Sequence, residues 1–391
     1  MDFEILRNFM DFMAENRTPG NSIQVLLNGE NVFEYCCGYS DYEKKIPLCG
    51  NELYNIYSCS KIATVVAAMQ LLERGKILLS DPLYEYIPEF RRMNIKFPDG
   101  SIRETQNPIL VGNLFTMTAG FSYDFNTPGF QKAKKKTKGV MDTVETIRCI
   151  AEDPIDFEPG TRWQYSIAHD VLAALVEVVS GKKFREYVKD SIFTPLTMTE
   201  SFYHHSHETL SNTAEQYRFE FSGSANVSIV ELQRSGNCQE GNFVNVGKRN
   251  PYVLGSEYDS GGAGVITSVS DYNKLLAALA NYGRGLNGEQ ILCPRSIDLM
   301  KTNRLNGELL KDYNWRQLQG CGYGLGVRTH TFPERSGVIA GRSEVGWGGA
   351  AGSTVIVDPE INLAVFYAQH LLNPREEYYQ PRLRNVVYSS L

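Results

Sequence analysis

The chain of 391 residues lacks several features that would each define a class of protein. It has no run of about 18 apolar residues, so we expect no transmembrane helix. Its 39 lysines and arginines are outnumbered by 45 aspartates and glutamates, and the net charge of −6 argues against a nucleic-acid partner. The first residues show no basic segment followed by an apolar stretch, which predicts a cytoplasmic protein without a secretory signal.

The eight cysteines include no C-x-x-C pair and no spacing typical of a zinc ribbon. In a cytoplasmic protein we expect them to be reduced thiols. The histidines of 204–207 lie too close in sequence to complete a tetrahedral zinc site without a distant fourth ligand. The sequence therefore predicts neither a metal nor a cofactor, and the lysine-rich segment 132–138 is expected to be a solvated face.

Hydrophobic residues make up 42% of the chain and charged residues 21%, which is typical of a globular protein with a large core. Apolar spacing predicts helices over 2–16 and 58–74, and Asn28-Gly29 predicts a hairpin between strands 23–27 and 32–35. Short apolar segments predict strands near the C-terminus, followed by a helix: Gly322–Arg328, Ser353–Val357, Leu363–Ala368 and Arg375–Leu391.

Strands at both ends of the chain with helices between them indicate an α+β fold. We expect residues 1–80 and 296–391 to build one sheet, and residues 81–295 to form a large, mainly helical insertion. Length alone would allow two or three domains, but this order of elements predicts a single catalytic unit. The sequence makes no prediction of the oligomeric state.

Ser58-Cys59-Ser60-Lys61 opens the helix predicted over 58–74 and is the main candidate for chemistry. Residues three apart on a helix share a face, so Lys61 is in reach of Ser58 and is a candidate base for it. The lysine pKa must then fall from about 10.4 toward 7, which burial at a helix N-terminus favours. The alternative is that Ser58 merely caps the helix. Cys59 should point into the packing, because successive helix residues diverge by about 100°.

Two further segments strengthen the interpretation of Ser58 as a nucleophile. Trp163–Ser166 precedes a strongly apolar helix, and the glycine-rich segment Trp347–Gly352 precedes a strand. A backbone N–H in the glycine-rich segment and that of Ser58 could together hold a tetrahedral oxyanion. A second Ser-x-x-Lys, Ser180–Lys183, follows a helix and contains Gly181, so it is predicted to be a turn with solvated lysines.

In this order the motifs resemble the serine hydrolases of the class C β-lactamase and penicillin-binding-protein family. The strings that carry the resemblance cover most of the chain: Ser58–Lys61, Gln70–Lys76, Asp81–Phe90, Leu114–Gly120, Tyr165-Ser166, Ser260–Gly264, Ser270–Tyr272, Trp347–Gly349 and Asp358-Pro359. The resemblance implies a β-lactamase/DD-peptidase-like fold, with an antiparallel sheet flanked by terminal helices.

The resemblance also implies roles for particular residues. Ser58 would be the acylated nucleophile, and Lys61 its base partner. Tyr165 would share the proton, acting as base toward the nucleophile and acid toward the leaving group. The backbone N–H groups of Ser58 and Ala350 would form the oxyanion hole.

Two departures from the family pattern concern substrate binding. Ile167 stands where the second motif often has asparagine, and Trp347-Gly348-Gly349 replaces the common Lys-Thr-Gly. An isoleucine cannot hydrogen-bond an amide, and an indole offers one N–H without positive charge. We therefore expect these four residues to contact a small, neutral ester, as in the family's carboxylesterase branch, which includes acyl-transferring relatives.

Two other functions stay open at this point. One is a β-lactamase or D-amino-acid peptidase, and the other is a catalytically silent binding or sensor module on the same scaffold. Presence of Ser58, Lys61 and Tyr165 together argues against the silent module. His169 lies four residues after Tyr165, but we expect it to be a structural histidine.

Overall fold

The computed structural model describes residues 1–221 and 241–391. Its main sheet has eight antiparallel strands in the order β10-β11-β12-β13-β14-β1-β2-β3. The strands are β1 (Gly20–Leu27), β2 (Glu30–Asp41), β3 (Ile46–Pro47), β10 (Gly322–Tyr323), β11 (Arg328–Thr329), β12 (Val345–Gly348), β13 (Thr354–Asp358) and β14 (Leu363–Gln369). The pairing of β1 with β14 joins the two ends of the chain in the middle of the sheet, which confirms the predicted α+β architecture.

The hairpin between β1 and β2 turns at Asn28-Gly29, as predicted. Both residues have positive φ, 52° and 80°, which is the backbone conformation that a tight two-residue turn requires. By contrast, the strand predicted over Gly322–Arg328 is wrong, because β10 and β11 are separate two-residue strands. The chain turns between them at Gly326 (φ 72°), whose N–H donates to the carbonyl of Phe115 instead of to a strand.

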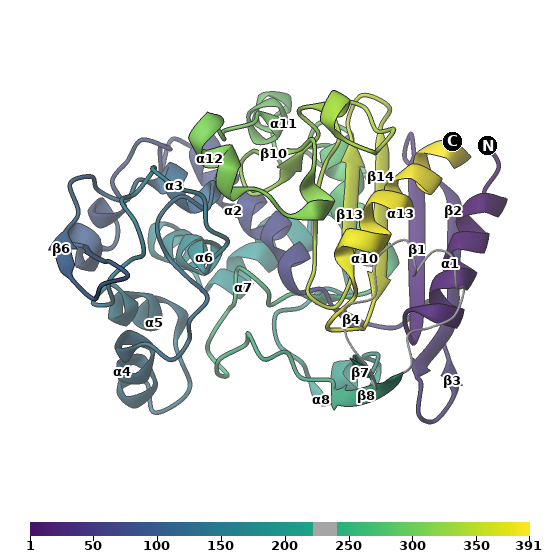
Figure 1. Cartoon of the computed structure of the whole chain (residues 1–391), viewed down its shortest axis with the longest axis horizontal. Coiled ribbons are helices and arrows are strands. Elements are labelled where there is room, and N and C mark those ends of the chain that lie inside the picture. Colours follow the sequence, from purple (N-terminus) through teal and green to yellow (C-terminus); the bar gives the residue numbers. More distant parts are fainter. Residues whose placement is uncertain (222–240) are drawn as a thin grey trace.

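Helices cover both faces of the sheet (Figure 1). The terminal helices α1 (Glu4–Asn16) and α13 (Glu376–Ser390) lie side by side on one face and confirm the two predicted terminal helices. Their apolar side chains enclose a core with β1 and β14, which includes Leu6, Met10, Val25, Val365 and Val387. On the other face, α10 (Val269–Ala280) packs against β14, β1 and β13.

Helix α2 (Lys61–Glu73) is buried from its first residue to Leu71, because it lies between the sheet and the helical region and packs against α6. The other helices are α3 (Val111–Phe115), α4 (Pro128–Lys136), α5 (Thr143–Ile150), α6 (Ala168–Ser180), α7 (Phe184–Val188), α8 (His207–Ser211), α11 (Pro294–Lys301) and α12 (Gly307–Asp312). Shorter turns are η1 (Tyr57–Ser60), η2 (Leu83–Glu85), η3 (Pro88–Arg91), η4 (Lys189–Phe193), η5 (Arg316–Leu318) and η6 (Pro333–Arg335).

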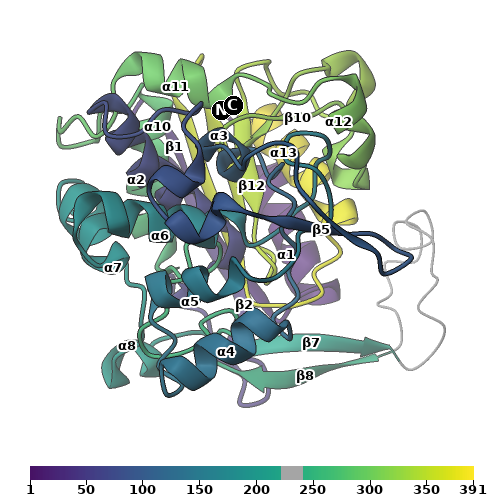
Figure 2. The same cartoon turned by 90° about the vertical axis from the view of Figure 1, so that its left-hand side faces the viewer.

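The region predicted to be mainly helical also contains short strand pairs, and Figure 2 shows the hairpin β7–β8 below the main sheet. These pairs are β4 (Tyr54–Asn55) with β9 (Ile266–Thr267), β5 (Asn94–Lys96) with β6 (Ile102–Glu104), and β7 (Gln216–Phe221) with β8 (Gly241–Gly247). Helix α10 lies within residues 81–295 and yet covers the main sheet. The division of the chain into a sheet region and a helical insertion at residues 81 and 295 therefore stays a prediction.

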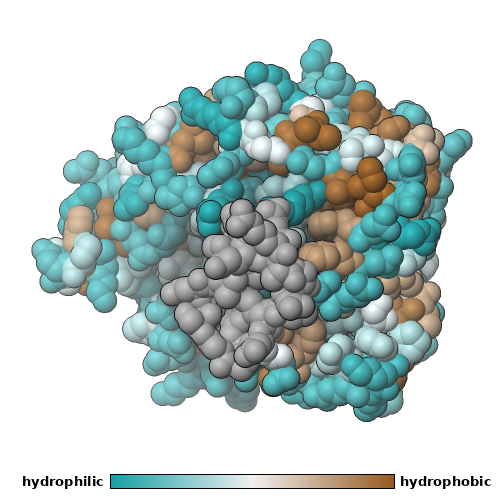
Figure 3. Space-filling model, turned by 45° about the vertical axis from the view of Figure 1, so that its right-hand side comes forward, coloured by the Kyte–Doolittle hydropathy of each residue, from teal (hydrophilic) through white to brown (hydrophobic). Residues whose placement is uncertain are grey.

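The surface is mixed in character. On the face seen in Figure 3, hydrophobic residues form separate groups among hydrophilic ones. Among the helices of residues 1–221 and 241–391, none has the length and apolarity needed to cross a bilayer. The seven cysteines in the same residues are free thiols. The cytoplasmic location stays a prediction.

Candidate active site

Ser58 lies in the 3₁₀ turn η1, immediately before α2. The preceding Tyr57 is fully buried with a φ of 46°, a left-handed conformation that costs a non-glycine residue on the order of 1 kcal/mol. Its hydroxyl donates to Oε1 of Gln216 at 2.5 Å, which holds the turn in place. The α-helix therefore begins at Lys61, three residues later than predicted, and its cap residue is Ser60 rather than Ser58.

The side chain of Lys61 is completely buried beside Ser58. Its Nζ lies 3.3 Å from the Oγ of Ser58, 2.9 Å from the hydroxyl of Tyr123 and 2.7 Å from the carbonyl oxygen of Gly262. Burial lowers the pKa of Lys61 to about 7, against the opposing effect of the negative charge on Asp170. A neutral amine has two N–H groups and one lone pair. With its N–H groups on Tyr123 and Gly262, the lone pair is left for the Ser58 hydroxyl.

Three partners of Lys61 were not predicted as site residues. Tyr123 comes from the loop after α3, Asp170 from the first turn of α6, and Gly262 from the loop before β9. A side chain at Gly262 would lie 2.6 Å from Oδ2 of Asp170, so only glycine lets this carbonyl approach the amine. Gly262 lies in the string Ser260–Gly264 that carries part of the family resemblance, whereas no sequence pattern singles out Tyr123.

Tyr165 stands on the other side of Ser58. Its hydroxyl accepts a hydrogen bond from the indole Nε1 of Trp347 at 3.0 Å and also bonds the Ser58 side chain. Burial raises the pKa of Tyr165 well above its ordinary value, and these two hydrogen bonds oppose that rise. The ring of Tyr165 is 4.7 Å from the Nζ of Lys61, so all three predicted catalytic side chains meet at one point.

The glycine-rich segment after β12 brings Ala350 to the same cavity as Ser58. At Gly349 a side chain would lie 2.3 Å from the carbonyl oxygen of Ile56, two residues before Ser58. The N–H of Gly349 donates to the carbonyl of Ser353 at 2.8 Å and closes the turn that carries Ala350. The close approach of Gly349 to Ile56 therefore brings together the segments that carry Ala350 and Ser58, the two residues predicted to supply the oxyanion hole.

The cavity above Ser58 has a volume of about 250 Å³. Aromatic and amide residues make up half of its lining, which consists of Ser58, Tyr123, Tyr165, Tyr252, Ala263, Trp315, Gln317, Leu318, Arg328, Trp347, Gly348, Ala350, Glu376 and Gln380. Of the predicted substrate contacts, Trp347 and Gly348 line this cavity. Gly349 supports the cavity through the hydrogen bond that its backbone N–H donates to the carbonyl of Ser353.

Contrary to prediction, Ile167 does not line the Ser58 cavity. Its side chain is buried, and its N–H donates to the carbonyl of Ser122 at 3.3 Å. The residue borders a separate small cavity with Phe121 and Ser122. The physical reason is that α6 begins directly after Ile167, so its side chain turns into the packing between that helix and the loop 121–130.

The remaining sequence candidates have structural partners. The thiol of buried Cys59 points to the carbonyl of Trp347 at 3.9 Å, and burial raises its pKa, so it is no nucleophile. His169 is fully buried with its pKa lowered to about 3 by burial, and its Nε2 lies 3.4 Å from the carbonyl of Phe115. The Nε2 of His204 contacts Asp259 at 2.8 Å. Within residues 1–221 and 241–391, no three His, Cys, Asp or Glu side chains converge as metal ligands.

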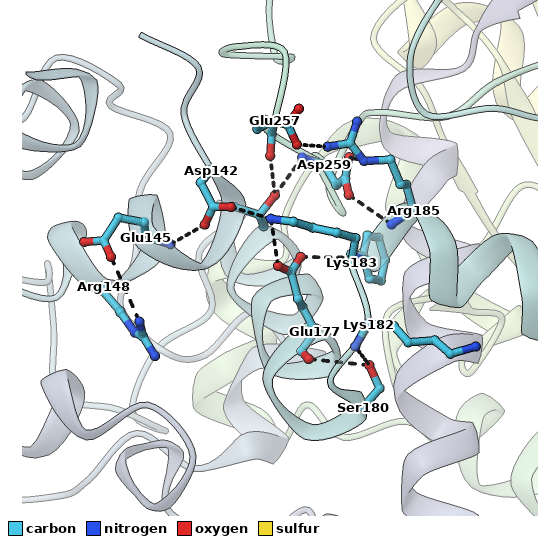
Figure 4. A network of polar contacts seen from close by, with 12 residues as sticks. Asp142, Glu145, Arg148, Glu177, Ser180, Lys182, Lys183, Arg185, Glu257 and Asp259 are labelled. Atoms are coloured by element: carbon cyan, nitrogen blue, oxygen red, sulfur yellow. Dashed lines mark hydrogen bonds and ion pairs between the residues drawn. The ribbon is translucent and has the colours of Figure 1, made fainter. Parts of the chain in front are cut away.

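Figure 4 shows that the second Ser-x-x-Lys belongs to a network of polar contacts. The ammonium of Lys183 contacts the carboxylates of Asp142 and Glu177 rather than Ser180. In the same network the Nε of Arg185 pairs with fully buried Asp259 at 3.1 Å. Asp259 begins the loop that carries Gly262, so this network anchors one wall of the Lys61 site.

A serine beside a buried lysine and a tyrosine on an α+β scaffold defines a serine hydrolase. A family model described as Beta-lactamase matches residues 5–388, and the chain belongs to this family. Esterase EstB of Burkholderia gladioli is 26% identical over 374 residues, which cover 91% of this chain and 87% of EstB. A putative D-alanyl-D-alanine carboxypeptidase of Escherichia coli (strain K12) is 24% identical, covering 83% of this chain and 70% of that protein.

Among solved structures, the fold is similar to that of EstCE1, described as a hydrolase with promiscuous acyltransferase activity. The two superimpose with a TM-score of 0.77 at 21% identity, and the match covers 98% of each chain. The likeness agrees with the β-lactamase/DD-peptidase-like fold expected from the sequence.

Proposed function

We propose that this protein cleaves small carboxylic esters through an acyl-enzyme on Ser58. The observation that carries the proposal is the environment of the Lys61 side chain. When the amine is neutral, its two N–H groups bond Tyr123 and Gly262, and its lone pair is left for the Ser58 hydroxyl at 3.3 Å. A base within hydrogen-bond reach and with a pKa near 7 suits general base catalysis at neutral pH.

In the proposed reaction the Oγ of Ser58 attacks the ester carbonyl while its proton moves to Lys61. The negative oxygen of the tetrahedral intermediate lies between the N–H groups of Ser58 and Ala350. Tyr165, with its hydroxyl hydrogen-bonded to Ser58, donates its proton to the leaving alkoxide as the C–O bond of the ester breaks, and takes up in exchange the proton that Ser58 gave to Lys61. Water then attacks the acyl-enzyme by the same steps in reverse, releasing the carboxylic acid and restoring Ser58.

The indole of Trp347 supports an ester over an anionic β-lactam. Trp347 stands at the motif position where a lysine would attract a carboxylate. Its only side-chain N–H already donates to the hydroxyl of Tyr165. The similarity to esterase EstB agrees with this choice.

The alternatives are a D-amino-acid peptidase, favoured by the similarity to a putative carboxypeptidase, and acyl transfer to an alcohol, as described for EstCE1. Transfer would use the same acyl-enzyme with an alcohol replacing water. A chromogenic cephalosporin, a D-alanyl-D-alanine peptide and p-nitrophenyl acetate, assayed side by side, separate these activities. Faster turnover of the cephalosporin or the peptide would reject the ester proposal.

A fluorophosphonate probe followed by peptide mapping tests the nucleophile without assuming a substrate. We expect labelling at Ser58, loss of labelling and of p-nitrophenyl acetate hydrolysis in Ser58→Ala, and full activity in Ser180→Ala, the matched control in the second Ser-x-x-Lys. Wild-type ester hydrolysis by Ser58→Ala would reject the mechanism, and an unlabelled Ser58 would favour a silent module.

A further inference from the structure

Glu376 is a carboxyl group inside the Ser58 cavity that the proposed reaction does not use. It occupies the first position of α13, and its Oε2 accepts a hydrogen bond from Nε2 of Gln317 at 3.0 Å. A side chain at Gly348 would lie 3.6 Å from its Oε1, so the carboxyl sits against the strand that carries Trp347. Within residues 1–221 and 241–391, no lysine, arginine or histidine pairs with it within 4.0 Å.

A carboxylate in such a place is costly without a cation, because burial disfavours its charge. The cost is visible in the pKa of Glu376, which burial raises to about 7. Neighbouring Glu377 adds a negative charge, and only the amide of Gln317 opposes the rise. A positively charged ligand in the cavity would supply the missing partner.

Aromatic rings line the same cavity as this carboxyl. The ring centroids of Trp315 and Trp347 lie 6.2 Å apart, and each is 5.4 Å from that of Tyr165. Trp315 is 37% exposed, so its ring is open to a ligand. Aromatic faces attract cations through their quadrupole, and several rings together form the usual binding site for quaternary ammonium groups.

We propose that Glu376, with Trp315 and Trp347, makes this cavity selective for esters that carry an ammonium group. This substrate class rests on the proposed esterase function and narrows it. The cavity of about 250 Å³ limits the whole substrate to a small molecule. Glu376 acts here as a specificity residue, because no step of ester cleavage passes through it.

The test compares two competitive inhibitors of p-nitrophenyl acetate hydrolysis. Choline and 3,3-dimethylbutan-1-ol have nearly the same shape, but only choline is charged. We expect choline to bind the wild-type enzyme about tenfold more tightly, which equals ~1.4 kcal/mol. Glu376→Gln should remove this difference in affinity between the two inhibitors. Glu377→Gln, one residue along the same helix, should keep the difference.

Two results would overturn the inference. One is equal affinity of the wild-type enzyme for choline and the neutral alcohol. The other is a loss of affinity in Glu376→Gln that is the same for choline and for the neutral alcohol, since this indicates a structural role. If Ser58 proves inactive toward esters, quenching of tryptophan fluorescence by choline still tests the ammonium site, so the two proposals fail separately.

Discussion

Replacing Lys61 by methionine tests the neutral state of the buried amine through protein stability. The native pKa of Lys61 is about 7, whereas the unfolded chain keeps the proton to about 10.5. Between these pH values the unfolded state binds more protons, so the contribution of Lys61 to stability rises with pH. Methionine fills a similar volume and does not titrate, so the variant lacks this rise.

The magnitude follows from the interval between the native pKa and the assay pH. From pH 7 to pH 9 the rise spans two pH units at 1.36 kcal/mol each, or ~3 kcal/mol. The hydrogen bonds to Tyr123 and Gly262 are lost in the variant at every pH, so they cancel in the comparison. Relative to Lys61→Met, the wild-type protein should therefore gain ~3 kcal/mol of unfolding free energy between pH 6 and pH 9.

Urea denaturation at pH 6 and pH 9 measures this difference. The exposed Lys76 provides the control, because Lys76→Met should shift stability by the same amount at both pH values. A difference between wild type and Lys61→Met that does not change with pH would mean that Lys61 keeps its proton in the native state. The proposed role of Lys61 as a base would then be untenable.

Two further predictions concern the groups around Ser58. Trp347→Phe removes the indole N–H that donates to the hydroxyl oxygen of Tyr165. Loss of this N–H···O hydrogen bond, worth ~1 kcal/mol, should lower kcat about fivefold with little change in KM. Steady-state kinetics checks this, and an unchanged kcat would show that the indole only lines the cavity. Gly349→Ala places a methyl group against the carbonyl of Ile56, so we expect kcat to fall at least about tenfold from the displaced oxyanion N–H, with fluorophosphonate labelling slowed in parallel. Wild-type kinetics in this variant would mean that the turn needs no glycine.

The sequence predicted local features well. Asn28-Gly29 specifies its turn through two positive φ values, and the terminal helices follow from their apolar spacing. The division of 322–328 into two strands was not predictable, because the turn at Gly326 is stabilised by a carbonyl from α3, about 200 residues earlier.

For the site, the family motifs led to Ser58, Lys61 and Tyr165, which the structure brings together. The same approach led to Ile167, which lies outside the cavity because a motif position does not fix the direction of a side chain. Glu376 was missed because it reaches the cavity only through the packing of α13 on the sheet. The prediction for Ile167 failed and Glu376 was missed because contacts between distant elements, rather than residue types, decide which side chains reach the cavity.

The position of Asp170 explains how Lys61 stays neutral beside a buried carboxylate. A direct ion pair would hold the proton on the lysine, but Asp170 is engaged instead by the hydroxyl of Ser260, which donates to Oδ1 at 2.7 Å. The remaining Coulomb attraction still raises the pKa of Lys61, against the larger effect of burial. Removing the charge should therefore lower the pKa of Lys61 further.

The test is the acid limb of the kcat/KM profile for p-nitrophenyl acetate. In the wild-type enzyme we expect kcat/KM to rise with an apparent pKa near 7, as Lys61 loses its proton. In Asp170→Asn, which keeps the shape of the side chain, this limb should move to lower pH. The exposed Asp190 provides the control, because Asp190→Asn should leave the limb unchanged. A limb that stays in place or moves to higher pH in Asp170→Asn would show that the acid limb does not report the protonation of Lys61. The buried carboxylate would then serve the packing of α6 rather than the tuning of the base.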